Sequence, residues 1–186
     1  LEEEDANNSA RYIGEPIRNF TSDLPIVVLD NFNRRRPSSD RDMHISIYEP
    51  KAEGDEKRAS VRNKPDLETR GNMRQRGSST GSWEKYSLAL EFRDEVDEDR
   101  DLGVLGMPPQ SDWVLSGRWE FDRALMRNPL MYELSRRIGR YAPRTRFVEV
   151  FSNTDDGVLE AQDYMGVYSL IEKVKRDPNR VDVEKL

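Results

Sequence analysis

The sequence predicts an α+β fold, in which a mostly antiparallel, twisted sheet is accompanied by one main helix. Several short segments alternate apolar and polar residues, which is the period of half-buried strands. One longer stretch, residues 122–138, repeats apolar residues every four positions, which is the period of an amphipathic helix. Without an internal repeat or a low-complexity tract, we expect one domain, residues 24–186, after a polar tail or strap, residues 1–23.

Length and composition exclude several classes of protein. With 186 residues, 35% hydrophobic and 35% charged, the chain can form one compact core with long charged loops. The formal net charge of −6 argues against nucleic acid as the main partner, because a phosphate backbone attracts a basic surface. The absence of cysteine excludes disulfides and thiolate chemistry. No apolar run reaches about 18 residues, and the acidic start is unlike a signal peptide, so we predict neither a membrane span nor a signal peptide in this chain.

The first part of the domain predicts two strands and a long loop. Residues 24–30 form a continuous apolar run that is typical of a buried strand, and the basic, polar residues 33–39 end it. Residues 43–48 alternate and predict a second strand. Its polar face carries His44, the only histidine, which has no His or Cys companion and is therefore interpreted as structural. Residues 51–68 are charged and patternless, which indicates a hairpin loop or insertion.

Residues 74–92 predict a hairpin with a polar loop. One strand ends at Arg76, residues 77–82 are Gly, Ser and Thr, and residues 86–92 alternate as a returning strand. The backbone N–H groups and hydroxyls of such a loop can hold a phosphate, and Lys85 lies at the start of the returning strand. The same residues fit an ordinary hairpin, and physical considerations alone favour that interpretation.

The middle of the chain carries an acidic stretch and a short strand. Six acidic residues lie between positions 93 and 101 and would attract Ca²⁺, but the spacing and glycine of an EF-hand are missing. We therefore predict a solvated turn. Residues 102–109 predict an apolar turn, and residues 111–115 predict a short strand.

Residues 122–138 predict the main helix, followed by two strands. Asp122 suits the N-cap and Gly139 suits the position after the last turn. Pro129 removes a hydrogen bond from a helix interior, so either the helix kinks there or its regular part begins with Asn128 as N-cap. The apolar stripe consists of Met126, Leu130, Leu134 and Ile138. Downstream, residues 144–151 and 164–171 alternate and predict an antiparallel pair of strands.

A set of short segments occurs in a fixed order along the chain: LPIVVLD (24–30), RGSS (76–79), LGMP (105–108), SDWVL (111–115), LMRN (125–128), YELSR (132–136), RYAPRTRFVEV (140–150), GVY (166–168), EK (172–173), KRD (175–177) and NRVD (179–182). No single segment is specific, but the ordered set is. Together these segments resemble the CotH kinase family, named for a bacterial spore-coat protein and also found in exported bacterial proteins.

The family looks like an atypical protein kinase, so the resemblance implies the N-terminal lobe of such an enzyme, with a phosphate-covering loop and a helix like αC. It implies ATP and Mg²⁺ as cofactors and phosphoryl transfer to Ser or Thr of bacterial surface or spore-coat proteins. The implied catalytic residues are Lys85, which would pair with the phosphates, and Glu133, which would hold Lys85. The implied cofactor-binding residues are Arg76, Gly77, Ser78, Ser79 and Gly81 in the loop, Arg127 and Asn128 on the helix, and Glu172 and Lys173 at the hinge.

The sequence departs from the family pattern at several positions. The family usually has a pair of lysines before the returning strand, whereas this chain has Glu84 and Lys85. Gln75 stands at a usually apolar position, and Pro129 interrupts a helix that the family continues. The later acidic segment that would bind Mg²⁺ and supply the base has no counterpart here. We therefore expect this chain to need a C-terminal lobe as a partner for catalysis.

Two functions from different classes remain open on the sequence. The first is the ATP-binding lobe of a CotH-like kinase, acting on a protein substrate of the surface or coat type. The alternative is a non-catalytic surface or matrix module that binds other proteins through the same fold, which the departures at Gln75 and Glu84 favour. Both imply a bacterial protein that is exported or located at the cell surface or spore coat.

Overall fold

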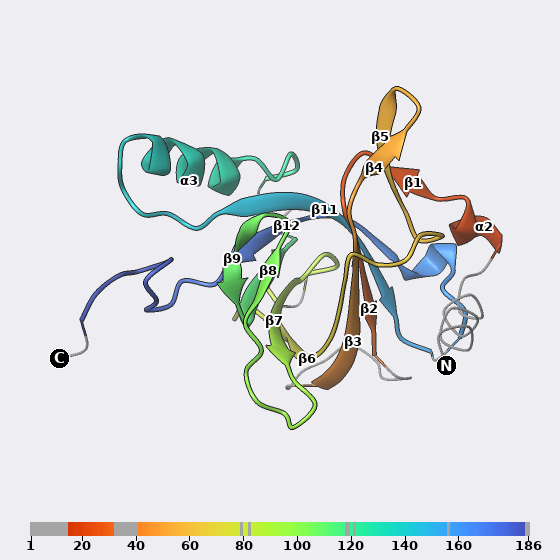
Figure 1. Ribbon diagram of the computed structural model, residues 1–186, viewed down its shortest axis with the longest axis horizontal. Coiled ribbons are helices and arrows are strands. Elements are labelled where there is room, and N and C mark those ends of the chain that lie inside the picture. Colours follow the sequence, from red (N-terminus) through yellow and green to blue (C-terminus); the bar gives the residue numbers. More distant parts are fainter. Residues whose placement is uncertain are drawn as a thin grey trace.

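Seven strands form a closed barrel in the computed structural model, which describes residues 15–31 and 41–184 apart from positions 79, 82, 118, 119, 121 and 156 (Figure 1). The strand order is β10-β12-β11-β2-β3-β6-β7, and β7 pairs with β10 to close the barrel. All neighbours are antiparallel except β2 and β11, which are parallel. The strands are β2 (Ile26–Asp30), β3 (Arg41–Tyr48), β6 (Leu67–Arg76), β7 (Ser87–Arg93), β10 (Asp112–Ser116), β11 (Thr145–Asn153) and β12 (Tyr164–Glu172).

The predicted α+β class, with a twisted sheet like that of a kinase N-terminal lobe, is wrong, because the described chain is mostly β and its main sheet closes on itself. The predicted strands exist, but two pairings that the sequence does not reveal close the sheet. Val27 of β2 pairs with Val150 of β11, and Ala89 of β7 pairs with Val114 of β10. Alternation predicts which face of a strand is buried, not which strand is its neighbour.

The barrel interior is filled by side chains from alternate positions of every strand, as expected for a small barrel. Trp113 of β10 and Tyr168 of β12 are among the largest fully buried side chains. The core also contains Val27, Leu29, Met43, Ile45, Ile47, Met73, Leu88, Leu90, Phe92, Leu115, Val148, Val150 and Leu170. The interior is therefore a packed core rather than a channel.

A second apolar cluster lies outside the barrel, against β2 and β11. It joins Ile17 of α2 (Glu15–Arg18), Ala59 of β5 (Glu56–Ser60), and Phe151 of β11. A small sheet, ordered β1-β5-β4, flanks it and includes β1 (Thr21–Ser22) and β4 (Lys51–Glu53). The charged stretch 51–68, predicted as a loop or insertion, thus contains the β4–β5 hairpin. Part of the predicted tail, 1–23, packs onto the barrel through Ile17. Residues 1–14 of that tail and the predicted loop 33–39 lie outside the described chain.

The region between β7 and β10 contains turns stabilised by local hydrogen bonds. Asp94 Oδ1 accepts the N–H groups of Val96 at 3.0 Å and Glu98 at 2.9 Å, so the acidic stretch folds as an exposed turn, as predicted. The predicted apolar turn that follows is a hairpin of β8 (Leu102–Val104) and β9 (Met107–Gln110). Its two central residues both have positive φ, which is typical of a tight hairpin turn.

The main helix, α3 (Arg127–Arg137), begins later than the predicted Asp122. Asp122 nevertheless stabilises the first turn of α3, because the Asp122 carboxylate accepts the backbone N–H of Arg127 at 2.7 Å. Pro129 is the third helical residue, where the missing N–H has no partner within the helix, so the proline neither kinks nor starts α3. Gly139 has φ +77° and donates to the carbonyl of Arg136 at 2.9 Å, which ends the helix as predicted.

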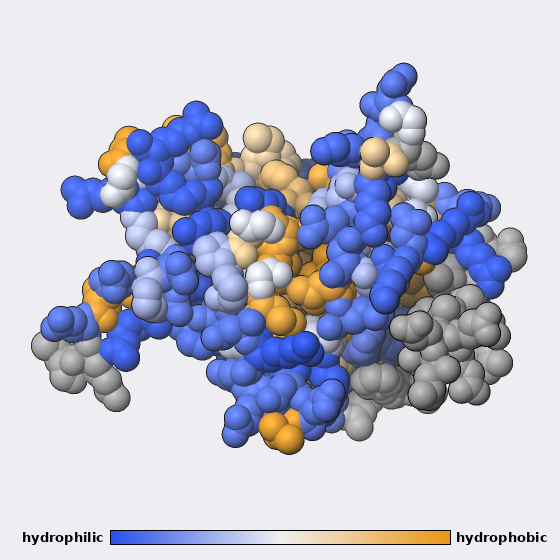
Figure 2. Space-filling model, in the orientation of Figure 1, coloured by the Kyte–Doolittle hydropathy of each residue, from blue (hydrophilic) through white to orange (hydrophobic). Residues whose placement is uncertain are grey.

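The apolar stripe of α3 faces solvent. An amphipathic helix normally buries its stripe against the core, but no residue of α3 is buried. The exposed fractions are 51% for Leu130, 47% for Leu134 and 76% for Ile138. Apolar atoms consequently appear among the charged side chains of α3 at the molecular surface (Figure 2). In the described part of the chain, no helix combines the length and apolar character needed to cross a membrane.

Candidate functional site

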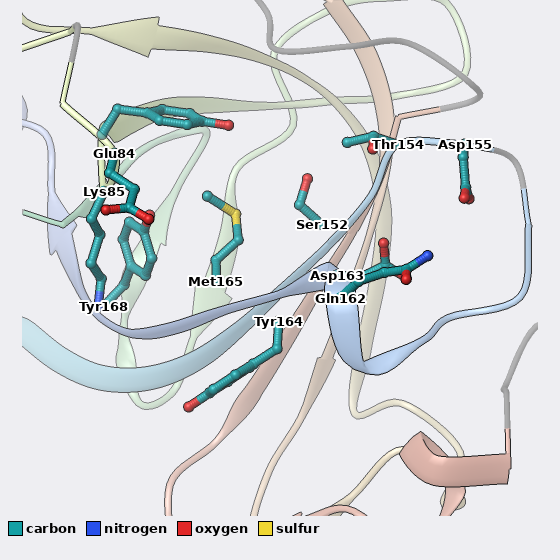
Figure 3. Close-up of a pocket in the computed structure, with 11 residues that line it drawn as sticks. Glu84, Lys85, Ser152, Thr154, Asp155, Gln162, Asp163, Tyr164, Met165 and Tyr168 are labelled. Atoms are coloured by element: carbon teal, nitrogen blue, oxygen red, sulfur yellow. The ribbon is translucent and has the colours of Figure 1, made fainter.

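A cavity of about 570 Å³ lies at one end of the barrel, where β11 ends and β12 and β7 begin. Its volume is in the range of small-molecule sites. Figure 3 shows Lys85 and Tyr168 on one side, Asp155, Gln162 and Asp163 on the other, and Met165 and Ser152 between them. The remaining lining residues are Glu84, Tyr86, Thr154 and Tyr164.

Lys85 reaches this cavity through a narrow slot. Its Nζ donates to the carbonyl of Val167 at 2.5 Å and lies 4.8 Å from the centroid of the Tyr168 ring. Gly117 and Gly166 form the walls of the slot. A Cβ on Gly166 would lie 3.2 Å from Lys85 Nζ, and one on Gly117 would lie 3.0 Å from Lys85 Cγ. The two glycines therefore make room for the lysine.

Burial lowers the pKa of Lys85, and the nearby carboxylates of Glu149 and Glu120 partly offset this effect. The ammonium is held by a carbonyl and an aromatic ring rather than by a carboxylate in direct contact. It remains available as a cation that can pair with a negatively charged group in the cavity.

The opposite wall is acidic. The carboxylate of Asp163 accepts the N–H of Glu160 at 2.8 Å and caps η2 (Ala161–Asp163). Burial raises the pKa of Asp163, and the negative charges of Asp155, Glu160 and Asp30 raise it further. Because the folded-state pKa is raised, ionisation of Asp163 reduces the free energy of unfolding as pH rises above about 4.

Glu149 and Tyr164 connect this end of the barrel to the outer sheet. Tyr164 donates its hydroxyl to Glu149 Oε2 at 2.5 Å, and Ser22 of β1 donates to Glu149 Oε1 at 2.9 Å. Burial and the Glu149 charge raise the pKa of Tyr164, so the hydroxyl stays a donor. Glu149 is thus held in one position near Lys85.

The predicted phosphate loop lies next to the cavity in sequence, but its described residues, Gly77, Ser78, Thr80 and Gly81, do not line the cavity. Arg76 ends β6 opposite Ser87 of β7. Gly77 has φ +108°, and a Cβ there would collide with the hydroxyl of Thr80. Gln75 donates its side-chain amide to the carbonyl of Gly81, which fixes the turn. Ser78 is exposed, whereas Ser79 lies outside the described residues.

Glu133 does not meet Lys85, contrary to the expected ion pair. Its Oε2 lies 2.5 Å from Arg136 Nη2 and its Oε1 lies 2.8 Å from Arg137 Nε, so both partners come from the same helix. These arginines lower the pKa of Glu133. The i,i+3 and i,i+4 spacing explains the pairing, because side chains so spaced share one side of a helix.

The other predicted cofactor-binding residues lie in two further places. Arg127 and Asn128 line a separate cavity of about 210 Å³ between the start of α3, β10 and β12. Glu172 and Lys173 lie at the opposite end of the barrel, and Glu172 follows the Lys85 partner Val167 by five positions along β12, which corresponds to roughly 17 Å. The structure therefore does not gather the predicted residues around one centre.

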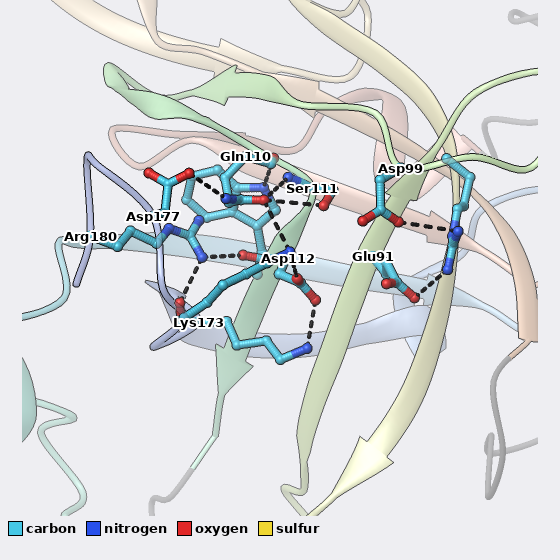
Figure 4. Close-up of polar contacts among 11 residues, drawn as sticks. Glu91, Asp99, Gln110, Ser111, Asp112, Lys173, Asp177 and Arg180 are labelled. Atoms are coloured by element: carbon cyan, nitrogen blue, oxygen red, sulfur yellow. Dashed lines mark hydrogen bonds and ion pairs between the residues drawn. The ribbon is translucent and has the colours of Figure 1, made fainter. Parts of the chain in front are cut away.

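A polar network ties the segment after β12 to that opposite end (Figure 4). Asp112 accepts Lys173 Nζ and Lys175 Nζ, each at 2.6 Å, which lowers its pKa. Glu172 accepts the backbone N–H of Arg144 at 2.8 Å and its guanidinium at 2.7 Å. Arg180 donates to the carbonyls of Asp112 and Lys173 at 2.9 and 2.7 Å. Glu172 and Lys173, the residues expected at the hinge, are thus engaged in contacts within the chain.

Lys85 alone among the lining residues was predicted as a site residue, and the polar residues that sequence reasoning missed in the cavity region include Glu149, Asp163 and Tyr164. One signal for Glu149 was present, since it is a charged residue within the apolar strand 147–151. No signal identified Asp163, which belongs to a turn, or Tyr164, which fits the strand pattern. Among the described residues, no group of three or more His, Asp or Glu is arranged to hold a metal ion.

The barrel and its cavity define a β-rich domain that carries one half-buried lysine at a site of small-molecule size. Residues 73–186, more than half of the chain, match the family model described as CotH kinase protein, and the chain belongs to this family. The match begins within β6, so the segment 24–30, which contains β2, lies outside it. No curated protein matches the chain.

Proposed function

We propose that this chain binds the phosphates of ATP in the Lys85 cavity and serves a CotH-family protein kinase. The supporting observation is that Lys85 is a half-buried cation in a cavity of about 570 Å³, next in sequence to a Gly- and Ser-rich turn. Phosphoryl transfer depends mostly on positioning and on stabilisation of negative charge, which a fixed lysine and loop N–H groups supply.

The charges around the cavity suit a nucleotide only together with a cation. Lys85 is positive, but Glu84, Asp155 and Asp163 also line the cavity and would repel a polyphosphate. Mg²⁺ would accompany ATP and offset this repulsion. Lys85 would exchange its contact with the Val167 carbonyl for a phosphate oxygen, which is a stronger, charge-assisted partner.

The protein substrate follows from the family rather than from the cavity. The resemblance implies Ser or Thr side chains of bacterial surface or spore-coat proteins as acceptors, and a location outside the cytoplasm. A C-terminal lobe would supply the Mg²⁺ ligands and the catalytic base. Lys85 and Glu133 keep their predicted catalytic roles only if such a lobe rearranges the helix.

Calorimetry with ATP, in the presence and absence of Mg²⁺, tests the proposal. We expect the chain to bind Mg–ATP, and Lys85→Met to weaken binding at least tenfold, because methionine keeps the packing against Tyr168 and removes the charge. Lys57→Met is the matched control, since Lys57 is exposed on β5. Absence of heat with the unsubstituted chain, or equal affinity of both variants, contradicts the proposal.

The second candidate is a non-catalytic module that binds other proteins. The observations that favour it are the contact of Lys85 with a backbone carbonyl and the pairing of Glu133 with its own helix. In this case ATP leaves the melting temperature unchanged, and Lys85→Ala retains binding to partner proteins. A rise in melting temperature with Mg–ATP that Lys85→Ala abolishes argues against this candidate.

A further inference from the structure

The outward side of α3 presents a continuous apolar surface, here called the α3 ridge: Leu130, Met131, Leu134 and Ile138. Their spacing places them on one side of the helix. Each is between 47% and 76% exposed. Single exposed apolar residues are ordinary, but four adjacent ones on a helix mark a binding surface.

The direction of the α3 ridge is set by contacts at both ends of the helix. At the start, Leu125 is buried and the N–H of Arg127 is held by Asp122. At the end, Arg136 donates to the carbonyl of Pro143 at 2.5 Å, next to the buried Ala142. The helix cannot turn its apolar side inward without breaking these contacts, so the ridge stays uncovered by the described part of the chain.

The surroundings of the α3 ridge are strongly basic. Residues 123–146 contain seven arginines and a single acidic residue, Glu133, whereas the whole chain has a net charge of −6. Arg127 and Arg137 lie on the ridge side of the helix, and Arg140 follows its end. Within the described chain, the guanidinium groups of Arg127 and Arg140 form no hydrogen bond or ion pair. They are free to pair with carboxylates of a partner.

We propose that the α3 ridge binds an acidic amphipathic helix of a partner protein. Apolar side chains of that helix, spaced i, i+3, i+4 and i+7, would cover the ridge, and its Asp or Glu residues would meet Arg127 and Arg140. The described ridge has no aromatic side chain, and the rest of the chain is acidic, so an anionic membrane surface fits less well. The inference holds whether or not the Lys85 cavity binds ATP.

Fluorescence anisotropy with designed peptides tests this proposal. The probe is a labelled, acetylated 16-residue peptide with leucines at the i, i+3, i+4 and i+7 spacing and glutamates on its other side. One control peptide has the same composition with the leucines dispersed, and another has lysines in place of the glutamates. We expect only the probe to bind, with an affinity that falls as salt concentration rises.

Variants of the chain locate the binding surface. The double substitution Leu130→Ser and Leu134→Ser is expected to weaken binding at least tenfold, and Arg127→Ser with Arg140→Ser is expected to weaken it several-fold and to flatten the salt dependence. Val96→Ser with Val174→Ser is the matched control, because both valines are exposed and neither belongs to α3.

Four results overturn the proposal: no binding of the probe, equal binding of the dispersed peptide, tighter ridge-dependent binding to phosphatidylserine vesicles, or ridge-dependent dimerisation of the chain in light scattering. Melting curves of each variant show that the fold is intact, so a loss of binding reports on the surface.

Discussion

Two glycines and a tyrosine determine where the ammonium of Lys85 can lie. Tyr168 is fully buried, and Gly117 packs directly against its ring. The position of the lysine is therefore encoded at residues distant in sequence, on β12 and after β10. Sequence reasoning proposed Lys85 as a site residue but did not predict this slot, because the role of a glycine becomes visible only when its neighbours in space are known.

Gly117→Ala tests this packing. The new Cβ would lie 2.6 Å from Tyr168 Cε1, so the side chain has to force the ring or the strand to move. We expect the free energy of unfolding to fall by about 1–3 kcal/mol, the usual cost of overpacking a core. Urea denaturation measures it.

Gly103→Ala is the matched control, since its nearest contact would be an ordinary 3.4 Å. If both variants lose the same stability, the slot is not tightly packed and the argument fails.

At the scale of elements, hydrophobic periodicity predicted that α3 is a helix but not which way its apolar side points. The four-residue repeat correctly predicted a helix that stops before Gly139, and the pattern of β11 and β12 correctly predicted an antiparallel pair. Periodicity did not reveal that the apolar side of α3 points outward, because contacts at Leu125 and Arg136 set the rotation of the helix. The pairing of Glu133 was likewise decided locally, by arginines three and four residues away.

Two leucines of the α3 region should respond differently to the same substitution. Leu134→Ser, on the exposed ridge, is expected to change the free energy of unfolding by no more than about 0.5 kcal/mol. Leu125→Ser, at the buried start of the helix, is expected to cost about 1.5–3 kcal/mol, because a buried leucine is lost. Thermal or urea unfolding of the two variants measures this difference, and a larger loss at Leu134 would show that the ridge is packed.

At the scale of the whole molecule, closure of the barrel depends on residues far apart in the chain. The parallel pair joins Val27 to Val150, and the outer sheet joins Thr21 to Ser60. The strands themselves could be predicted from local alternation, but the closed barrel could not, since no local pattern encodes a partner so distant in sequence.

This topology has a kinetic consequence. Chains rich in non-local strand pairs fold slowly, so we expect refolding on the scale of milliseconds to seconds rather than microseconds. Stopped-flow dilution from urea, followed by tryptophan fluorescence, measures the rate. Refolding complete within the dead time would mean that the barrel forms from local contacts first.

Trp113 lies under the guanidinium of Arg180, 5.1 Å from its ring, and donates its indole N–H to the carbonyl of Gln110 at 2.8 Å. A fully buried indole emits at shorter wavelength than one in water, and a cation above its face perturbs its excited state. Trp113 of β10 is therefore an intrinsic fluorescent probe for the segment after β12: release of Arg180 from the barrel would change the emission of Trp113 without any added dye.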